Sequence, residues 1–258
     1  MRIVVVGSGS IVPSPERFGS GLLIETGSLR IGVDPGPGYL EKLRRLRVSP
    51  KSLLACFITH FHLDHVADLL PLLMLWAYDQ DGKPSTSPGK LNLVGPAGLS
   101  QLVHTIAEET FPYLSRTMGC NRYTTTAELR NGGVWESEGL RAVAAEVEHF
   151  NGLAYRFEAE HRSVVFSGDT TPDERLVKLA KGCDVLIHEC SFPEEVMLGK
   201  HTSEKQLAKL VETIRPRTIV ATHLYPAWEG AEKRLETALK GCGAENIVVA
   251  RDMTVIEI

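Results

Sequence analysis

The sequence is poor in cysteine, and its cysteines do not pair in sequence. The five of them are scattered between Cys56 and Cys242, and no two form a Cys-x-x-Cys arrangement. An odd number at wide spacing disfavours a disulfide framework, and a cysteine-based zinc finger would need close pairs. We therefore expect a reduced protein of the cytoplasm.

Long apolar runs are also missing. The longest, LLPLLMLWA at 69–77, is interrupted by Pro71 and is too short to cross a bilayer. The first residues, MRIVVVGSGS, contain only a four-residue apolar run, whereas a secretory signal needs roughly 7–15 apolar residues. The sequence predicts neither a membrane span nor a secretory signal.

The chain has no excess of positive charge. Its 28 Lys and Arg residues are outnumbered by 32 Asp and Glu residues, which gives a net charge of -4. Such a balance does not indicate a strongly nucleic-acid-binding surface, although local basic patches are compatible with it. With 258 residues and 43% hydrophobic content, the chain can bury one sizeable core, and we expect a single domain over residues 1–258.

Short apolar runs bounded by turn residues recur through the whole chain and predict strands. Early runs follow one another through short turns, whereas later runs alternate with helical patterns. This mixture predicts an α/β fold with mixed sheets covered by helices. The predicted strands are Ile3–Val6, Leu22–Glu25, Leu29–Val33, Leu53–Thr59, Leu91–Val94, Leu140–Ala145, Ala154–Phe157, Ser163–Ser167, Val185–His188, Thr218–Thr222 and Ile247–Ala250.

Helix signals are clearest in the second half. Thr171 followed by Pro, Asp and Glu predicts a helix N-cap, and Ser203 with Gln206 predicts a capping box. Two segments rich in turn residues or irregular in pattern predict long loops, at about 79–90 and 116–133. The remaining predicted helices are Gly38–Arg47, Gly98–Glu109 and Ala231–Lys240.

The segment ITHFHLDHVADLL, residues 58–70, concentrates side chains that can bind metal. His60, His62, Asp64 and His65 stand within six positions, directly after a predicted strand. Imidazole and carboxylate are the ligands that zinc and similar divalent ions take. A polar loop with a helix cap would explain any one of these residues, but it does not explain four together.

Further metal-capable residues follow other apolar runs. Because active sites gather at strand ends in α/β folds, these residues are candidates for the same site. His104, inside a predicted helix, and His161, in a polar turn, are interpreted as structural or solvent-exposed. The candidates are His149, Asp169, His188 with Glu189, and His223.

The order of these residues resembles the metallo-β-lactamase-fold superfamily. The matching residues are His60-x-His62-x-Asp64-His65, then His149, Asp169 and His223. The segments GSGSIVPSPERFGSGLLIE, IGVDPGPG, LNLVGPAGL and VVFSGDT are similar to the ribonuclease Z-like branch of that superfamily. So is LIHECSF at 186–192 followed by HTS at 201–203.

The resemblance implies a four-layer αββα sandwich of two mixed sheets and a site for two divalent ions. Zinc is the first expectation, with manganese or iron open. One ion would be held by His60, His62 and His149, the other by Asp64, His65 and His223, and Asp169 would bridge them.

The resemblance also implies a hydrolytic reaction. A hydroxide bridging the two ions would attack a phosphodiester, and Asp64 would orient that nucleophile. His201, oriented by Glu189, would contact the phosphate and protonate the leaving oxygen.

Departures from ribonuclease Z favour a small or cyclic phosphodiester over tRNA. Leu63 stands where that family has Gly, and LYPAW follows His223 where it has Ser and then Arg-Tyr. Only residues 150–168 separate His149 from Asp169, which leaves no room for a tRNA-clasping arm. RNA is the less favoured partner, and a homodimer is expected only by analogy.

Alternatives on the same site are a tRNA 3′-processing endonuclease, an arylsulfatase, and a lactone or β-lactam hydrolase. A metal-binding protein without turnover is the least favoured hypothesis. Roles for His188, Cys190 and Arg17 in the site are left open. Five aromatic residues could line a substrate pocket or pack in the core: Trp76, Tyr78, Tyr113, Tyr123 and Trp228.

Overall fold

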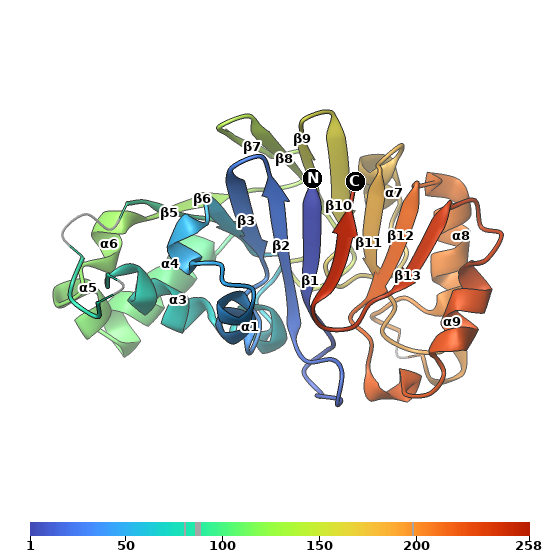
Figure 1. Cartoon of the computed structure of the whole chain (residues 1–258), viewed down its shortest axis with the longest axis horizontal. Helices are drawn as coiled ribbons and strands as arrows, with labels where there is room; N and C mark the ends of the chain where they lie inside the picture. The colour runs from blue at the N-terminus through green and yellow to red at the C-terminus, as the bar shows by residue number, and fades with distance from the viewer. Residues whose placement is uncertain (80, 86–88, 198) are drawn as a thin grey trace.

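Two β-sheets pack face to face and carry helices on their outer faces (Figure 1). The computed structural model describes residues 1–79, 81–85, 89–197 and 199–258. Within these residues each sheet has seven strands, and both contain parallel and antiparallel pairs. The predicted four-layer αββα arrangement is therefore confirmed.

The first sheet contains both ends of the chain. Met1 and Ile258 exchange backbone hydrogen bonds of 2.8 and 3.0 Å where β1 runs antiparallel to β14. In spatial order its strands are β14 (Thr254–Glu257), β1 (Arg2–Ser8), β2 (Ser20–Thr26), β3 (Leu29–Val33), β4 (Ala55–Phe57), β5 (Leu91–Gly95) and β6 (Thr124–Glu128).

The second sheet is parallel on one side and antiparallel on the other. Strands β10 to β13 run parallel, and β7 to β10 form antiparallel pairs. In spatial order its strands are β13 (Asn246–Val249), β12 (Thr218–Thr222), β11 (Val185–Glu189), β10 (Arg162–Phe166), β9 (Leu153–Ala159), β8 (Leu140–Glu146) and β7 (Val134–Ser137).

The largest apolar cluster lies between the sheets. Phe57 on β4 packs edge-on against Tyr155 and Phe157 on β9, with ring centroids 5.3 and 4.9 Å apart. Separate clusters fill the outer faces of the two sheets, under the helices. Burying a large apolar side chain stabilises the fold by about 1.5–3 kcal/mol, so this layered core holds the strand ends in place.

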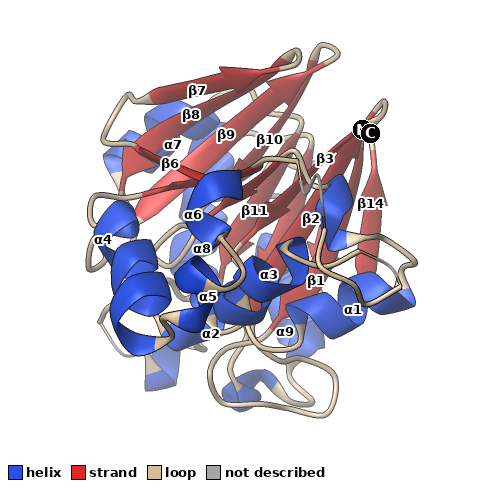
Figure 2. Ribbon diagram, turned by 90° about the vertical axis from the view of Figure 1, so that its left-hand side faces the viewer, coloured by secondary structure: helices blue, strands red, loops and turns tan. Residues whose placement is uncertain are grey.

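The helices lie outside both sheets (Figure 2). Helices α7 and α9 pack against strands of the second sheet, and α8 packs against both of these helices. The helices are α1 (Tyr39–Arg45), α2 (Leu63–Val66), α3 (Leu69–Trp76), α4 (Leu99–His104), α5 (Tyr113–Arg116), α6 (Cys120–Tyr123), α7 (Glu174–Ala180), α8 (Glu204–Ile214) and α9 (Glu232–Leu239), with single turns η1 (Pro50–Ser52), η3 (Glu194–Val196) and η4 (Pro226–Trp228) and a π-helical turn η2 (Thr105–Thr110).

One of the two predicted helix caps is correct. The capping box at Ser203 is present: its side chain accepts from the Gln206 amide, and the Gln206 side chain accepts from the Ser203 amide. The N-cap predicted at Thr171 is wrong, because α7 begins after Asp173. The Asp173 carboxylate accepts the Arg175 amide at 2.7 Å, and a charged acceptor suits a helix N-terminus better than a hydroxyl.

The predicted loop at 116–133 is also wrong in part. It contains α6 and the edge strand β6, which pairs parallel with β5. Strand β6 consists mainly of threonine and is half exposed, so it lacks the apolar run that marks a buried strand. The short strands β7 and β14 were missed for the same reason. The predicted loop at 79–90 lies partly outside the described residues.

No helix among the described residues is long and apolar enough to cross a membrane. The apolar run at 69–77 instead forms α3, whose Leu69, Leu72, Leu73 and Trp76 are buried.

Candidate metal centre

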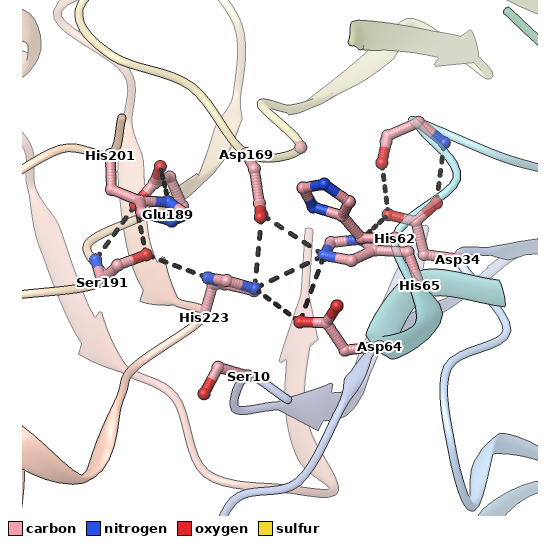
Figure 3. Close-up of polar contacts among 12 residues, drawn as sticks. Ser10, Asp34, His62, Asp64, His65, Asp169, Glu189, Ser191, His201 and His223 are labelled. Atoms are coloured by element: carbon pink, nitrogen blue, oxygen red, sulfur yellow. Dashed lines mark hydrogen bonds and ion pairs between the residues drawn. The ribbon is translucent and has the colours of Figure 1, made fainter. Parts of the chain in front are cut away.

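The seven predicted ligand residues converge at one edge of the two sheets. Figure 3 shows four of them, Asp64, His65, Asp169 and His223, with their polar groups pointing toward one another. His60 follows β4, Asp169 follows β10 and His223 follows β12 directly. His62, Asp64 and His65 lie at the start of α2, and His149 lies in the turn between β8 and β9. The parallel strands end together at this edge, which brings distant segments of the chain side by side.

Three residues form the set we call the inner set: Asp64, His65 and His223. All three are buried. Asp64 Oδ2 lies 3.3 Å from His223 Nε2 and 3.8 Å from His65 Nε2, and the two Nε2 atoms are 3.4 Å apart. The three ligand atoms therefore surround one point.

His60, His62 and His149 form the outer set. His149 Nε2 lies 3.3 Å from His62 Nδ1, and the His60 ring packs edge-on against both neighbours at 4.6 and 4.7 Å between centroids. His60 is buried, whereas His62 is exposed and His149 is half-buried. This set faces solvent on one side.

Asp169 lies between the two sets. Its Oδ1 is 3.4 Å from both His65 Nε2 and His223 Nε2, and its Oδ2 is 3.7 Å from His60 Nε2. Each carboxylate oxygen thus faces a different set. This is the arrangement that a bridging ligand requires.

The residues fit divalent cations. Zn–N bonds of about 2.0–2.1 Å imply ligand atoms about 3.3 Å apart around a tetrahedral ion, which matches the distances from 3.3 to 3.8 Å within the inner set. His60 Nε2 is buried and makes no hydrogen bond within the described part of the chain. A buried nitrogen without a partner costs free energy unless an ion binds it.

The electrostatics also favour a cation. Burial, together with the charge on His65, holds the pKa of His60 well below its usual value, so this imidazole is neutral and can act as a ligand. Burial opposes a charge on His65, but Asp169 and Asp34 outweigh it and raise the pKa of His65 well above the usual value. In the absence of metal, a proton on His65 would neutralise part of the acidic cage.

Close backbone packing positions Asp64. A Cβ at Gly36 would lie 2.0 Å from the Asp64 carbonyl oxygen and 2.6 Å from that of Ser20, so only glycine fits there. His223 adopts a left-handed backbone conformation with φ of 56°. Strained conformations of this kind are held by their surroundings and cluster at functional sites.

Asp34 supports both ligand sets and was not singled out from the sequence. Its Oδ2 lies 2.7 Å from His65 Nδ1 and accepts the Thr59 hydroxyl at 2.7 Å, and the Thr59 Oγ1 is 3.0 Å from His60 Nδ1. Carboxylates at such positions orient a ligand imidazole and fix its tautomer. The signal was available, because Asp34 directly follows the apolar run Leu29–Val33.

His201 lies beside the centre and is held by Glu189. The His201 Nδ1 is 3.0 Å from Glu189 Oε1, and the His201 ring stacks on His223 at 5.7 Å between centroids. Burial opposes a charge on His201, but Glu189, Asp169 and Asp64 outweigh it and raise the pKa of His201. His201 also lies close enough to Asp169 and His223 to form a third group with them.

An aromatic pair not expected from the sequence borders the His201 side. Phe192 and Tyr225 stack at 4.3 Å between centroids, and Tyr225 lies 6.0 Å from His201. Burial and the nearby carboxylates raise the pKa of Tyr225 to about 12, which keeps its phenol neutral. Of the five aromatic residues considered from the sequence, Trp76, Tyr123 and Trp228 are buried in the core.

The three residues whose roles the sequence left open, Arg17, His188 and Cys190, are all buried. Arg17 is buried, donates to the Ala250 carbonyl at 2.9 Å and pairs with Glu232 at 3.1 Å. Cys190 is fully buried, and burial raises the pKa of its thiol well above the usual value. His188 is fully buried with Nδ1 2.7 Å from the Glu189 carbonyl oxygen.

Leu63 and the two histidines set aside from the site lie at the surface. Leu63, at the first position of α2, has 70% of its surface exposed. A side chain is therefore accommodated where the resembling family has glycine. His104 is exposed at the end of α4, and His161 is exposed in the turn between β9 and β10. Their exposure agrees with the interpretation of both as structural or solvent-exposed residues.

A cleft of about 460 Å³ opens beside the outer set. His62 and His149 line it, together with Phe150 and Lys200. Phe150 has 80% of its surface exposed. The Phe150 ring and the Lys200 ammonium group therefore border the approach to the candidate ligands His62 and His149.

Similar proteins were found by sequence and by structure. The Ribonuclease Z of Mycobacterium bovis (strain BCG / Pasteur 1173P2) is 26% identical over 279 residues, covering 100% of this chain and 98% of that protein. The metallo-beta-lactamase fold protein YhfI from Bacillus subtilis shares the fold with a TM-score of 0.81 at 21% identity, covering 99% of both chains. The short form of human tRNase Z has a TM-score of 0.76 at 20% identity, covering 100% of this chain and 99% of that one.

These likenesses confirm the resemblance to the metallo-β-lactamase fold and to its ribonuclease Z-like branch, and they support the expectation of a metal-dependent hydrolase. Residues 1–239 match the family model described as anti-Pycsar protein Apyc1. Since this match spans most of the 258 residues, the chain belongs to the anti-Pycsar protein Apyc1 family.

Proposed function

We propose that this protein is a dinuclear zinc phosphodiesterase acting on a small or cyclic phosphodiester. The convergence of the inner set, the outer set and Asp169 on one edge, with the His201–Glu189 pair beside them, is the observation that carries the proposal. The outer set would hold one ion and the inner set the other, and Asp169 would contribute one oxygen to each.

Two bound ions would supply an activated water and neutralise charge on the phosphate. The chain's own residues then have separate tasks. Burial opposes a charge on Asp64, but the His223 hydrogen bond and the charge on His65 outweigh burial and lower the pKa of Asp64. Its carboxylate is therefore ionised and acts only as an acceptor. It would orient the attacking water and take its proton.

His201 would protonate the leaving oxygen. Its Nδ1 is bound by Glu189, which leaves Nε2 to donate. A general acid of this kind contributes about 10²–10⁴-fold to rate.

The size of the approach supports a small substrate. The cleft at the outer set falls within the range of about 300–1,000 Å³ usual for small-molecule sites. Between His149 and Asp169 the chain forms only the β9–β10 hairpin, which turns at Glu160 and His161. Lys200 would attract the phosphate, and Phe150 would contact an aromatic or apolar group.

Hydrolysis assays with the zinc-loaded protein test the proposal. Bis(p-nitrophenyl) phosphate and 3′,5′-cyclic mononucleotides should be cleaved, and Asp64→Ala should abolish both activities. Precursor tRNA is included because the M. bovis relative is named Ribonuclease Z. Cleavage of precursor tRNA alone, or of an aryl sulfate, lactone or cephalosporin alone, would refute the small phosphodiester.

His201→Asn separates the acid role from a structural one. A p-nitrophenolate leaving group needs no proton, so its release should change little. Release of a sugar alkoxide should slow by about 10²–10⁴-fold. Equal losses on both substrates would contradict the assignment of His201 as general acid.

A further inference from the structure

Ser191 lies between the inner set and the His201–Glu189 pair. It follows β11, is fully buried, and sits beside both Glu189 and His223 (Figure 3). Its Oγ is 2.6 Å from Glu189 Oε2 and 2.9 Å from His223 Nδ1. Its sequence position alone did not indicate a role for it.

The hydrogen bonds around Glu189 fix the direction of the Ser191 hydroxyl. Glu189 Oε1 accepts the Thr170 amide at 2.9 Å and faces His201 Nδ1 at 3.0 Å. Glu189 Oε2 accepts both the amide and the hydroxyl of Ser191, at 3.0 and 2.6 Å. An ionised carboxylate only accepts, so the Ser191 hydroxyl proton is directed to Glu189.

That direction determines the tautomer of His223. With its proton on Glu189, the Ser191 oxygen can only accept from His223 Nδ1, which must then carry a hydrogen. A neutral imidazole protonated at Nδ1 has its lone pair at Nε2. His223 Nε2 is the atom that faces Asp64 and Asp169, at 3.3 and 3.4 Å.

We propose that Ser191 is a positioning residue that holds His223 in the metal-binding tautomer and links it, through Glu189, to His201. One hydroxyl thereby connects a ligand of the inner set with the residue on the leaving-group side. The chain of contacts runs from His223 Nδ1 to Ser191 Oγ, to the two oxygens of Glu189, and to His201 Nδ1.

The expected consequence is confined to the inner set. Substituting groups that orient a ligand imidazole typically lowers metal affinity by about 10–100-fold. Ser191→Ala should produce a loss of this size for one ion and leave the other unchanged, because the outer set does not contact Ser191. Ser191→Thr keeps the hydroxyl and should retain near wild-type affinity.

Ser163→Ala is the matched control. Ser163 is also buried, and its hydroxyl is 3.1 Å from the Asp184 carboxylate, but it lies at the start of β10, away from the ligands. A purely structural loss of a buried hydroxyl would affect both variants alike. A loss of zinc affinity specific to Ser191→Ala would not follow from packing alone.

The experiment is competition between a zinc chelator and the metal-free proteins, with ¹⁵N spectra of the histidine rings. Ser191→Ala should weaken one zinc by about 10–100-fold and shift His223 toward the Nε2–H tautomer. Unchanged affinity with an unchanged His223 tautomer would overturn the proposal. Should Ser191→Ala fold poorly, Ser191→Cys, a weaker donor, should give an intermediate loss, and wild-type affinity in that variant would also overturn it.

The inference rests on the proposed function only for the identification of His223 as a ligand. Zinc affinity and tautomer are measured without substrate. If the wild type binds two zinc ions but cleaves no phosphodiester, the proposed activity fails and the role of Ser191 can still be established. If phosphodiesters are cleaved and Ser191→Ala binds zinc as the wild type does, only the role of Ser191 fails.

Discussion

The inner and outer sets have similar chemistry but different surroundings. Every member of the inner set is buried. Both of its histidines have a polar partner at the ring nitrogen turned away from the centre: Asp34 for His65 and Ser191 for His223. In the outer set, His60 alone has such a partner, the Thr59 hydroxyl. Within the described residues, the hydrogen-bond partner found for a ring nitrogen of His62 or of His149 is the other of these two histidines.

The difference indicates that the two sets have different roles. Partners behind the inner histidines fix their orientation before an ion arrives, which lowers the entropy lost on binding. The exposed His62 and half-buried His149 lie at the cleft, where substrate and water have access. We therefore expect the inner ion to be bound more tightly and the outer ion to exchange more readily.

Substitution of Asp169 should have the largest effect, because its two carboxylate oxygens face both sets. Asp169→Ala removes the carboxylate that faces His60 on one side and His65 on the other. Zinc binding at both positions should weaken by more than the roughly 10–100-fold typical of an orienting group. Hydrolysis should be lost, and metal analysis after dialysis checks the first point. Retention of two ions would contradict a bridging role.

Substitution of one histidine from each set should separate the sets. His65→Ala should lose the inner ion and stay inactive at any zinc concentration, because a buried imidazole is not readily replaced by water. His62→Ala should keep one ion and regain activity in excess zinc, since water can reach the exposed position. Identical metal content and identical rescue in the two variants would remove the distinction between the sets.

Asp34→Asn should have a smaller effect that extends to both sets. The Asn side chain has one acceptor oxygen, whereas the two Asp34 oxygens accept from His65, the Thr59 amide and the Thr59 hydroxyl. Zinc affinity should fall by about 10–100-fold, as measured by chelator competition. Asp184→Asn, at the start of the second sheet's parallel strands and away from the ligands, is the control and should bind zinc normally.

The sequence pointed to the candidate ligands because the segments that carry them follow apolar runs. Strand ends meet at one edge in α/β folds, so His60, Asp169 and His223 could be brought together without knowledge of the strand order. The four-layer architecture required the resemblance as well, because apolar runs alone do not fix which strands share a sheet.

The supporting residues were harder to predict. Asp34 and Ser191 act through contacts between residues 31 and 32 positions apart. Asp34 follows an apolar run, as the candidate ligands do, but nothing local in the sequence shows that it contacts His65 or that Ser191 contacts His223. The edge strand β6 escaped prediction because its threonines are half exposed and lack an apolar run. Helix α7 begins after Asp173 and not after Thr171, because the Asp173 carboxylate accepts the Arg175 backbone amide.

Calorimetric titration of the metal-free protein with zinc tests the central claim most directly. Two ligand sets that share Asp169 predict two binding events per chain, the tighter one abolished by His65→Ala and the weaker one weakened further by His62→Ala. A single zinc per chain, or two events that both survive these substitutions, would contradict the account.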